Sequence, residues 1–170
     1  MSTLKVGTIQ STTANTSMNI STGGIITYPN QIAFAATSAT SQTITNATWT
    51  KVNLTNVELN RGNAYSSVNS RFTPPVDGIY HFTTIGNFET TTSPGGYIYF
   101  AIRKNGTVEL YTSGMRLTSQ AIQDDTQLNG GYMLELTTSD YVEMWGYCAG
   151  PSSTASFRGS RNKFQGFLVG

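Results

Sequence analysis

The sequence predicts an all-β sandwich, and three observations support this fold class. Short segments rich in β-branched and aromatic residues follow one another from about Ile32 onward, separated by Gly, Pro, Asn and Asp. No window of helical length carries apolar residues at i, i+3, i+4 and i+7 without a glycine or a competing two-residue period. Charged residues make up only 11% of the 170 residues, so Thr, Ser, Asn and Gln must cover most of the surface.

Residues 71–86, RFTPPVDGIYHFTTIG, show how the strands are delimited. Pro74 and Pro75 fix φ and lack a backbone donor, so the strand that contains Phe72 must end before them. Asp77 and Gly78 form the turn. The next strand then places Tyr80 and Phe82 on one face, and we expect both rings to anchor the core.

The remaining strands follow from the same mixture of alternating apolar residues and turn residues. In chain order, the strand segments expected in the head are 48–54, 78–85, 97–106, 107–113, 131–137, 140–148, 156–160 and 163–170. Their number and spacing favour a sandwich or a jelly roll.

Residues 1–30 differ from the rest of the chain. They are rich in Ser, Thr, Asn and Gly, and their apolar side chains are few: Leu4, Val6, Ile9, Met18, Ile20, Ile25 and Ile26. So few apolar groups do not make a core, which predicts an extended arm that becomes ordered on something else. We therefore divide the chain into an N-terminal docking arm, 1–30, and a globular head, 31–170.

Three of the expected strands, in 97–102, 141–148 and 163–169, carry large apolar side chains on both faces. A sandwich in water needs only one apolar face per sheet. We interpret the second face as a contact with another subunit, and lone surface tyrosines are the alternative. The side chains that alternation places on this second face, and hence at the predicted interface, are Tyr97, Tyr99, Tyr147 and Phe167.

Several motifs occur in the order that is typical of one known family. A signature F-x-x-P-x-x-G-x-Y-x-F runs from Phe72 to Phe82, an N-G turn lies at 105–106, and an F-x-G-F strand closes the chain at 164–167. Leu136, Asp140 and Val142 match an L-x-x-G-D-x-V strand pair, with Ser139 where the family usually has Gly. Over residues 31–170 the chain resembles the globular head of complement component one-q.

This resemblance implies the fold and assembly of the family. The expected fold is the ten-stranded jelly roll that the family shares with tumour necrosis factor. The expected assembly is a compact homotrimer with the last strand, and the four predicted interface residues, near the threefold axis. The residues that carry the core signature are Phe72, Gly78, Tyr80, Phe82, Phe164 and Gly166.

The first segment, residues 1–24, is similar to N-terminal segments of virion structural and tail-fibre-like proteins from bacteriophages, marine cyanophages especially. This similarity implies that the protein is located in a virion. Animal relatives of the head carry signal peptides and collagen repeats, whereas MSTLKVGTIQ has no apolar region of the secretory type. We therefore do not expect an extracellular animal protein.

The residues available for chemistry are few. His81, the single histidine, lies opposite Tyr80 and Phe82 on its strand, and Cys148, the single cysteine, is expected to be a buried small apolar group. The adjacent Asp124 and Asp125 are the candidates for a calcium site, but two carboxylates fall short of the 6–8 oxygen ligands that calcium takes. We therefore expect an enzymatically inactive protein with no cofactor.

The charge balance bears on the partners. Ten Lys and Arg against nine Asp and Glu, spread along the chain, give a net charge of +1, which is not the basic stripe of a nucleic-acid-binding protein. The longest apolar run, residues 32–36, is too short for membrane insertion. We therefore expect a virion surface knob, anchored by its arm to a capsid protein, as a decoration protein, or to a tail protein. The alternative is a tail-tip adhesin that recognises a host surface glycan or protein.

Overall fold

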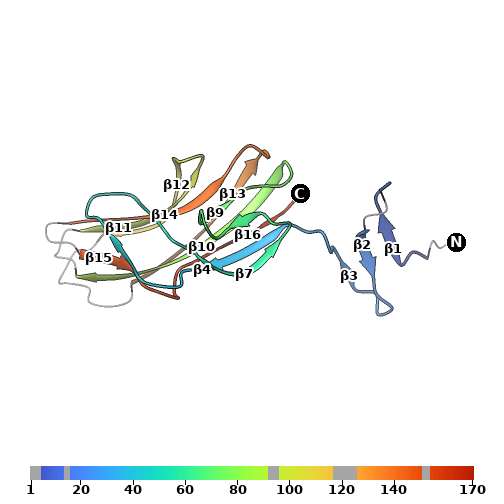
Figure 1. Ribbon diagram of the computed structural model, residues 1–170, viewed down its shortest axis with the longest axis horizontal. Coiled ribbons are helices and arrows are strands. Elements are labelled where there is room, and N and C mark those ends of the chain that lie inside the picture. Colours follow the sequence, from blue (N-terminus) through green and yellow to red (C-terminus); the bar gives the residue numbers. More distant parts are fainter. Residues whose placement is uncertain (1–4, 14–15, 92–95, 117–125, 151–153) are drawn as a thin grey trace.

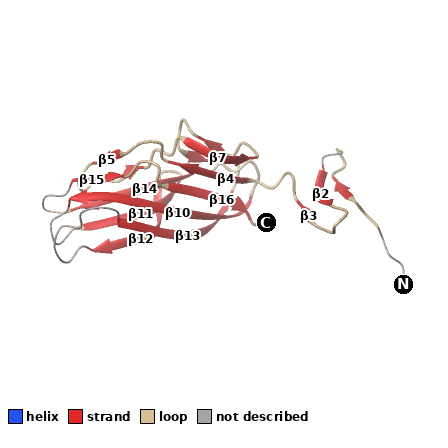
Figure 2. Ribbon diagram, turned by 90° about the horizontal axis from the view of Figure 1, so that it is seen from below, coloured by secondary structure: helices blue, strands red, loops and turns tan. Residues whose placement is uncertain are grey.

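The computed structural model describes residues 5–13, 16–91, 96–116, 126–150 and 154–170. The regular secondary structure of these residues consists of β-strands, as Figures 1 and 2 show. This confirms the predicted all-β fold class. Among the same residues there is no helix that could cross a membrane.

The arm folds as a small antiparallel sheet of its own. Its strands, in spatial order, are β1 (Thr8–Gln10), β2 (Thr16–Ile20) and β3 (Ile26–Thr27). This sheet lies beyond one end of the head, and the C-terminus of the chain lies at the same end (Figure 1).

The head is a sandwich of two antiparallel sheets (Figure 2). The first, called here the β10 sheet, contains in spatial order β5 (Gln42–Ile44), β15 (Thr154–Phe157), β10 (Gly78–Thr91), β16 (Lys163–Leu168), β4 (Ala33–Thr37) and β7 (Asn56–Arg61), with β13 (Thr126–Leu136) paired to the other edge of β10. The second, called here the β14 sheet, contains β12 (Thr107–Arg116), β11 (Tyr97–Lys104), β14 (Val142–Ala149), β9 (Arg71–Phe72) and β8 (Tyr65–Ser66), with β6 (Thr50–Lys51) paired to β14.

The core between the sheets is built mainly from aromatic rings. Phe72, Tyr80, Phe82 and Phe164 of the expected signature are fully buried. The ring of Phe34 lies 4.9 Å from those of both Phe72 and Phe164, measured between centroids. Such ring pairs contribute beyond the apolar area they bury, so alternation in β4, β10 and β16 selects the side chains that hold the two sheets together.

Glycine is required where the chain passes these rings. A Cβ added at Gly166 would lie 2.7 Å from the ring of Phe82 and 2.8 Å from the carbonyl oxygen of His81. Gly78, the other glycine of the signature, begins β10 beside the chain end, where Ile79 donates a backbone hydrogen bond to Gly170. Both glycines therefore lie at close approaches of one strand to another.

The N-G turn and Asp140 fix one end of the β14 sheet. Asn105 and Gly106 both have positive φ, 52° and 77°, as a two-residue hairpin between β11 and β12 requires. One oxygen of Asp140 accepts a 2.7 Å hydrogen bond from the Thr137 backbone amide, and the other accepts one of 2.7 Å from the Asn105 side chain. These bonds, with Lys104 3.3 Å away, hold the pKa of Asp140 well below its ordinary value.

Candidate interaction surfaces

The outer face of the β10 sheet carries two rows of side chains that cross β4, β16, β10 and β13. Pairing between the strands aligns one row as Arg61 of β7, Ala33, Phe167, His81 and Met133. The neighbouring row runs from Leu59 of β7 through Ala35, Gln165, Thr83 and Gly131. Arg61, at the β7 end of the first row, is the one charged side chain in these two rows. The nearest charge on β16 is Lys163, which is paired with Glu58 at 2.6 Å.

The apolar side chains of this face are open to water. Phe167 is 44% exposed and Met133 is 55% exposed, although both lie within a sheet. A shallow depression of about 190 Å³ lies between Leu59, Gln165 and Phe167. The His81 ring lies 5.5 Å from the ring of Phe167, so the single histidine is part of this face.

The outer face of the β14 sheet carries a line of aromatic rings. The centroid of Tyr99 lies 6.2 Å from those of both Tyr97 and Tyr147, and Trp49 lies 5.3 Å from Tyr147. The guanidinium of Arg103 lies over the ring of Trp145 at 4.3 Å and within 5.1 Å of the Trp49 ring. Rings and arginine therefore contact one another across the strands.

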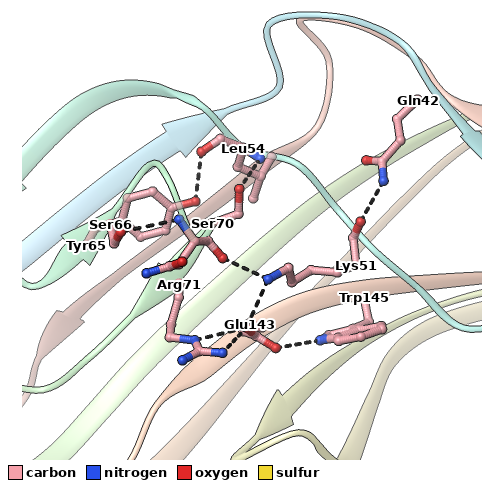
Figure 3. Close-up of polar contacts among 10 residues, drawn as sticks. Gln42, Lys51, Leu54, Tyr65, Ser66, Ser70, Arg71, Glu143 and Trp145 are labelled. Atoms are coloured by element: carbon pink, nitrogen blue, oxygen red, sulfur yellow. Dashed lines mark hydrogen bonds and ion pairs between the residues drawn. The ribbon is translucent and has the colours of Figure 1, made fainter.

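Glu143 is the polar centre of this second face, as Figure 3 shows. It is 2% exposed, although alternation directs it outward. One carboxylate oxygen accepts hydrogen bonds from Arg71, at 2.8 and 3.0 Å, and from Lys51 at 3.3 Å, and the other accepts one from the indole of Trp145 at 3.1 Å. Arg71 also covers the ring of Tyr141, with its guanidinium carbon 3.7 Å from the centroid. The charge is thus buried by its own partners.

The four residues predicted to form one interface lie on two different surfaces. Tyr97, Tyr99 and Tyr147 lie on the outer face of the β14 sheet, whereas Phe167 lies on that of the β10 sheet. This corrects the expectation of a single surface near one axis. The two-residue period shows which side chains point out of a sandwich, but only strand pairing shows which sheet they leave.

The other candidate residues are placed as follows. Cys148 is buried at the end of β14. Asp124 and Asp125 lie outside the described residues. Within the part of the chain that is described, there is no group of three or more His, Cys, Asp or Glu that could hold a metal ion. Sequence reasoning missed the contacts of Glu143 with Lys51 and Arg71, since they join residues that are 92 and 72 positions apart and leave no periodic signal.

Comparison with known proteins identifies the architecture. The model of the C1q domain matches residues 33–169. The globular domain of zebrafish complement 1qA protein is 17% identical, with a TM-score of 0.57 over 82% of this chain and 98% of that one. The Eiger TNF from S. frugiperda is 10% identical, with a TM-score of 0.59 over 83% of this chain and 94% of that one. No curated protein matches the chain. Because the matched segment spans both sheets of the jelly roll, the chain belongs to the C1q domain family.

Proposed function

We propose that the protein is a non-enzymatic, homotrimeric head whose subunits meet through the outer face of the β10 sheet. The observation that carries the proposal is the pair of rows, uncharged except for Arg61 at the β7 edge, that leaves Phe167 and Met133 open to water. Domains of the C1q and tumour necrosis factor type commonly form homotrimers. Contiguous exposed apolar patches mark protein contacts more often than free surface.

The composition of this face suits a close contact. Ala33, Ala35 and Gly131 have little or no side chain, so the backbone of a neighbour can approach the sheet. Phe167 supplies the apolar area. Because it is 44% exposed, covering it contributes roughly half of the 1.5–3 kcal/mol that full burial of such a side chain gives. A threefold axis repeats that contribution in each subunit.

A second candidate function concerns the opposite side of the head. Because the two sheets pack face to face, a trimer that buries the outer face of the β10 sheet directs the outer face of the β14 sheet toward the surroundings. The line of rings from Tyr97 to Trp49 is then displayed on a rigid sheet. Exposed aromatic rings on such scaffolds recognise carbohydrates and proteins, which favours an adhesin that binds a host surface glycan or protein.

The proposed location is a bacteriophage virion, with the arm attached to a capsid or a tail protein. The supporting observation is the similarity of residues 1–24 to N-terminal segments of phage virion and tail-fibre-like proteins. The arm also extends away from the head (Figure 1), where it can add its strands to a neighbouring sheet. We place capsid attachment slightly ahead of the tail.

The trimer is tested by light scattering coupled to gel filtration on the purified chain. We expect three times the mass of one chain, maintained on dilution into the nanomolar range. A protein that remains monomeric at micromolar concentration would contradict the proposal.

Attachment is tested by deleting residues 1–30. We expect a folded, trimeric head that no longer joins virions, and normal incorporation of the truncated protein would show that the head itself attaches.

The copy number of the protein per virion distinguishes a capsid location from a tail location, since hundreds of copies indicate the capsid and a dozen or so indicate the tail. A glycan array separates decoration from adhesion, because only an adhesin shows saturable binding.

A further inference from the structure

The small sheet of the arm has one apolar face and one polar face. Ile9 pairs directly with Met18, and Ile20 pairs directly with Ile26. Since Met18 and Ile20 are two positions apart on β2, all four apolar side chains lie on the same face. Pairing aligns Thr8, Asn19 and Thr27 on the other face, where the Thr8 hydroxyl lies 3.4 Å from the Asn19 side-chain oxygen.

The apolar face is open within the described chain. Ile9 is 46% exposed and Ile26 is 51% exposed, although each is paired with another apolar residue. A hollow of about 460 Å³ between the arm and the head is lined by Ser17, Tyr28 and Gln31 together with Leu168 to Gly170. A second hollow, of about 600 Å³, is lined by Ile26 to Pro29 together with Gln31 and Arg61. The head therefore lies beside the arm across these hollows and leaves Ile9 and Ile26 about half exposed. Strands of three, five and two residues bury little apolar surface by themselves, so a second layer over the apolar face would stabilise this sheet.

We propose that the arms of two further copies of this chain cover this apolar face, so that three arm sheets form a neck around the threefold axis. The inference rests on the homotrimer proposed above. It leaves the polar faces and the outer strand edges of the neck free to attach the particle to a larger assembly.

Two observations favour further copies of the chain as the occupant. The first is position: β4 follows the arm directly and supplies Ala33 and Ala35 to the proposed subunit contact. The arm therefore leaves the head from that contact, and three arms begin close to one axis. The second is charge: Lys5 is the only charged residue among residues 1–30. Three copies of this segment can pack closely with little like-charge repulsion.

The test uses disulfide cross-linking of the full chain with Met18→Cys, and Asn19→Cys as its matched control on the polar face of the same strand. Cys148 is the only cysteine of the sequence and is buried, so the unmodified protein is the negative control for cross-linking. A disulfide needs Cα atoms within about 7 Å, which three apolar faces around an axis allow. Under mild oxidation we expect about two chains in three of Met18→Cys to migrate as dimers, since one cysteine per trimer has no partner. Asn19→Cys should remain monomeric on the denaturing gel.

Light scattering on the same samples separates the two proposals. A trimeric Met18→Cys protein that does not cross-link, or that cross-links no better than Asn19→Cys, overturns the neck and leaves the trimeric head intact. A monomeric mass for the unmodified chain overturns the trimer as well.

Proteolysis of the arm is a second measurement. Ile20→Asp should accelerate thermolysin cleavage of the arm about tenfold, whereas Thr27→Asp on the polar face should not. Equal cleavage of the two variants contradicts the neck.

Discussion

On the outer face of the β14 sheet the side chains contact one another, whereas on the outer face of the β10 sheet the apolar side chains are open to water. On the first face, Arg103 contacts two tryptophan rings, and Glu143 is enclosed by Arg71, Lys51 and Trp145. On the second, Phe167 and Met133 stand among alanine, threonine and glycine. Both faces are outer surfaces of one sandwich, but only one of them is already covered.

The difference shows how side-chain length determines what a sheet face can do. Long charged and aromatic side chains fold over their own strands, so that Ala101, which alternation directs outward between Tyr99 and Arg103, is fully buried. Short side chains cannot do this, and they leave the backbone within reach of a neighbour. A self-covered face contributes to the stability of the fold, whereas we expect an open face to contribute to association.

The largest effect on stability is expected from Glu143→Gln. Breaking a buried ion pair leaves its partners uncompensated and costs about 3–5 kcal/mol. The side chains of Lys51 and Arg71 are 31% and 33% exposed, so water can partly solvate them, and we expect about 3 kcal/mol at most. Urea unfolding at a fixed protein concentration measures the loss.

The matched control is Glu58→Gln on the β10 sheet, which breaks the more exposed pair with Lys163. Exposed pairs contribute about 0–1 kcal/mol, so this variant should unfold nearly as the unmodified protein does. Equal losses for the two variants would remove the contrast between a self-covered and an open face.

A smaller effect is expected from Arg103→Ala. This change removes the guanidinium that contacts Trp145 and Trp49, and cation–π contacts contribute about 0.5–2 kcal/mol. We expect destabilisation of about 1–2 kcal/mol together with a red shift of tryptophan fluorescence, because the rings become more exposed. Arg103→Lys should lose part of this stability, since lysine lacks the planar group that stacks. An Arg103→Ala protein with unchanged fluorescence and stability would show that the stacking is incidental.

Acid should weaken the end of the β14 sheet that Asp140 holds. The Thr137 amide and the Asn105 side chain keep the folded-state pKa of Asp140 below its ordinary value, which is about 3.9. The stabilisation is therefore fully present above that value and is lost as the pH falls from about 4 toward the lower folded-state pKa. Melting curves between pH 2 and pH 7 should show a smaller acid-induced drop for Asp140→Asn. An identical pH profile for the variant would mean that other carboxylates account for acid sensitivity.

Local patterns in the sequence were sufficient to predict much of the head. Alternation placed Tyr80, Phe82 and Phe164 in the core, and the N-G pair at 105–106 marked a hairpin. These features depend on neighbours within a few residues. The segment expected as a strand at 48–54 forms a strand only at Thr50–Lys51, although Val52 also donates a backbone hydrogen bond to Met144 of β14.

Features that depend on distant contacts could not be predicted in this way. The assignment of Phe167 and Tyr99 to different sheets follows from pairing with β10 and β14, which lie far from each other in sequence. The sheet within the arm was also missed. Its strands are only three, five and two residues long, which is too short for alternation to distinguish them from turn segments.

The central claim is that the subunits meet through the outer face of the β10 sheet and not through that of the β14 sheet. It is tested most directly by light scattering on two variants, Phe167→Glu and Tyr97→Glu, which place the same charge at comparably exposed aromatic positions on the two faces. A carboxylate buried at a threefold contact meets two copies of itself, so we expect Phe167→Glu to be monomeric. Tyr97→Glu should remain a trimer with the elution volume of the unmodified protein. A trimeric Phe167→Glu protein, or a Tyr97→Glu protein that dissociates, would contradict this assignment.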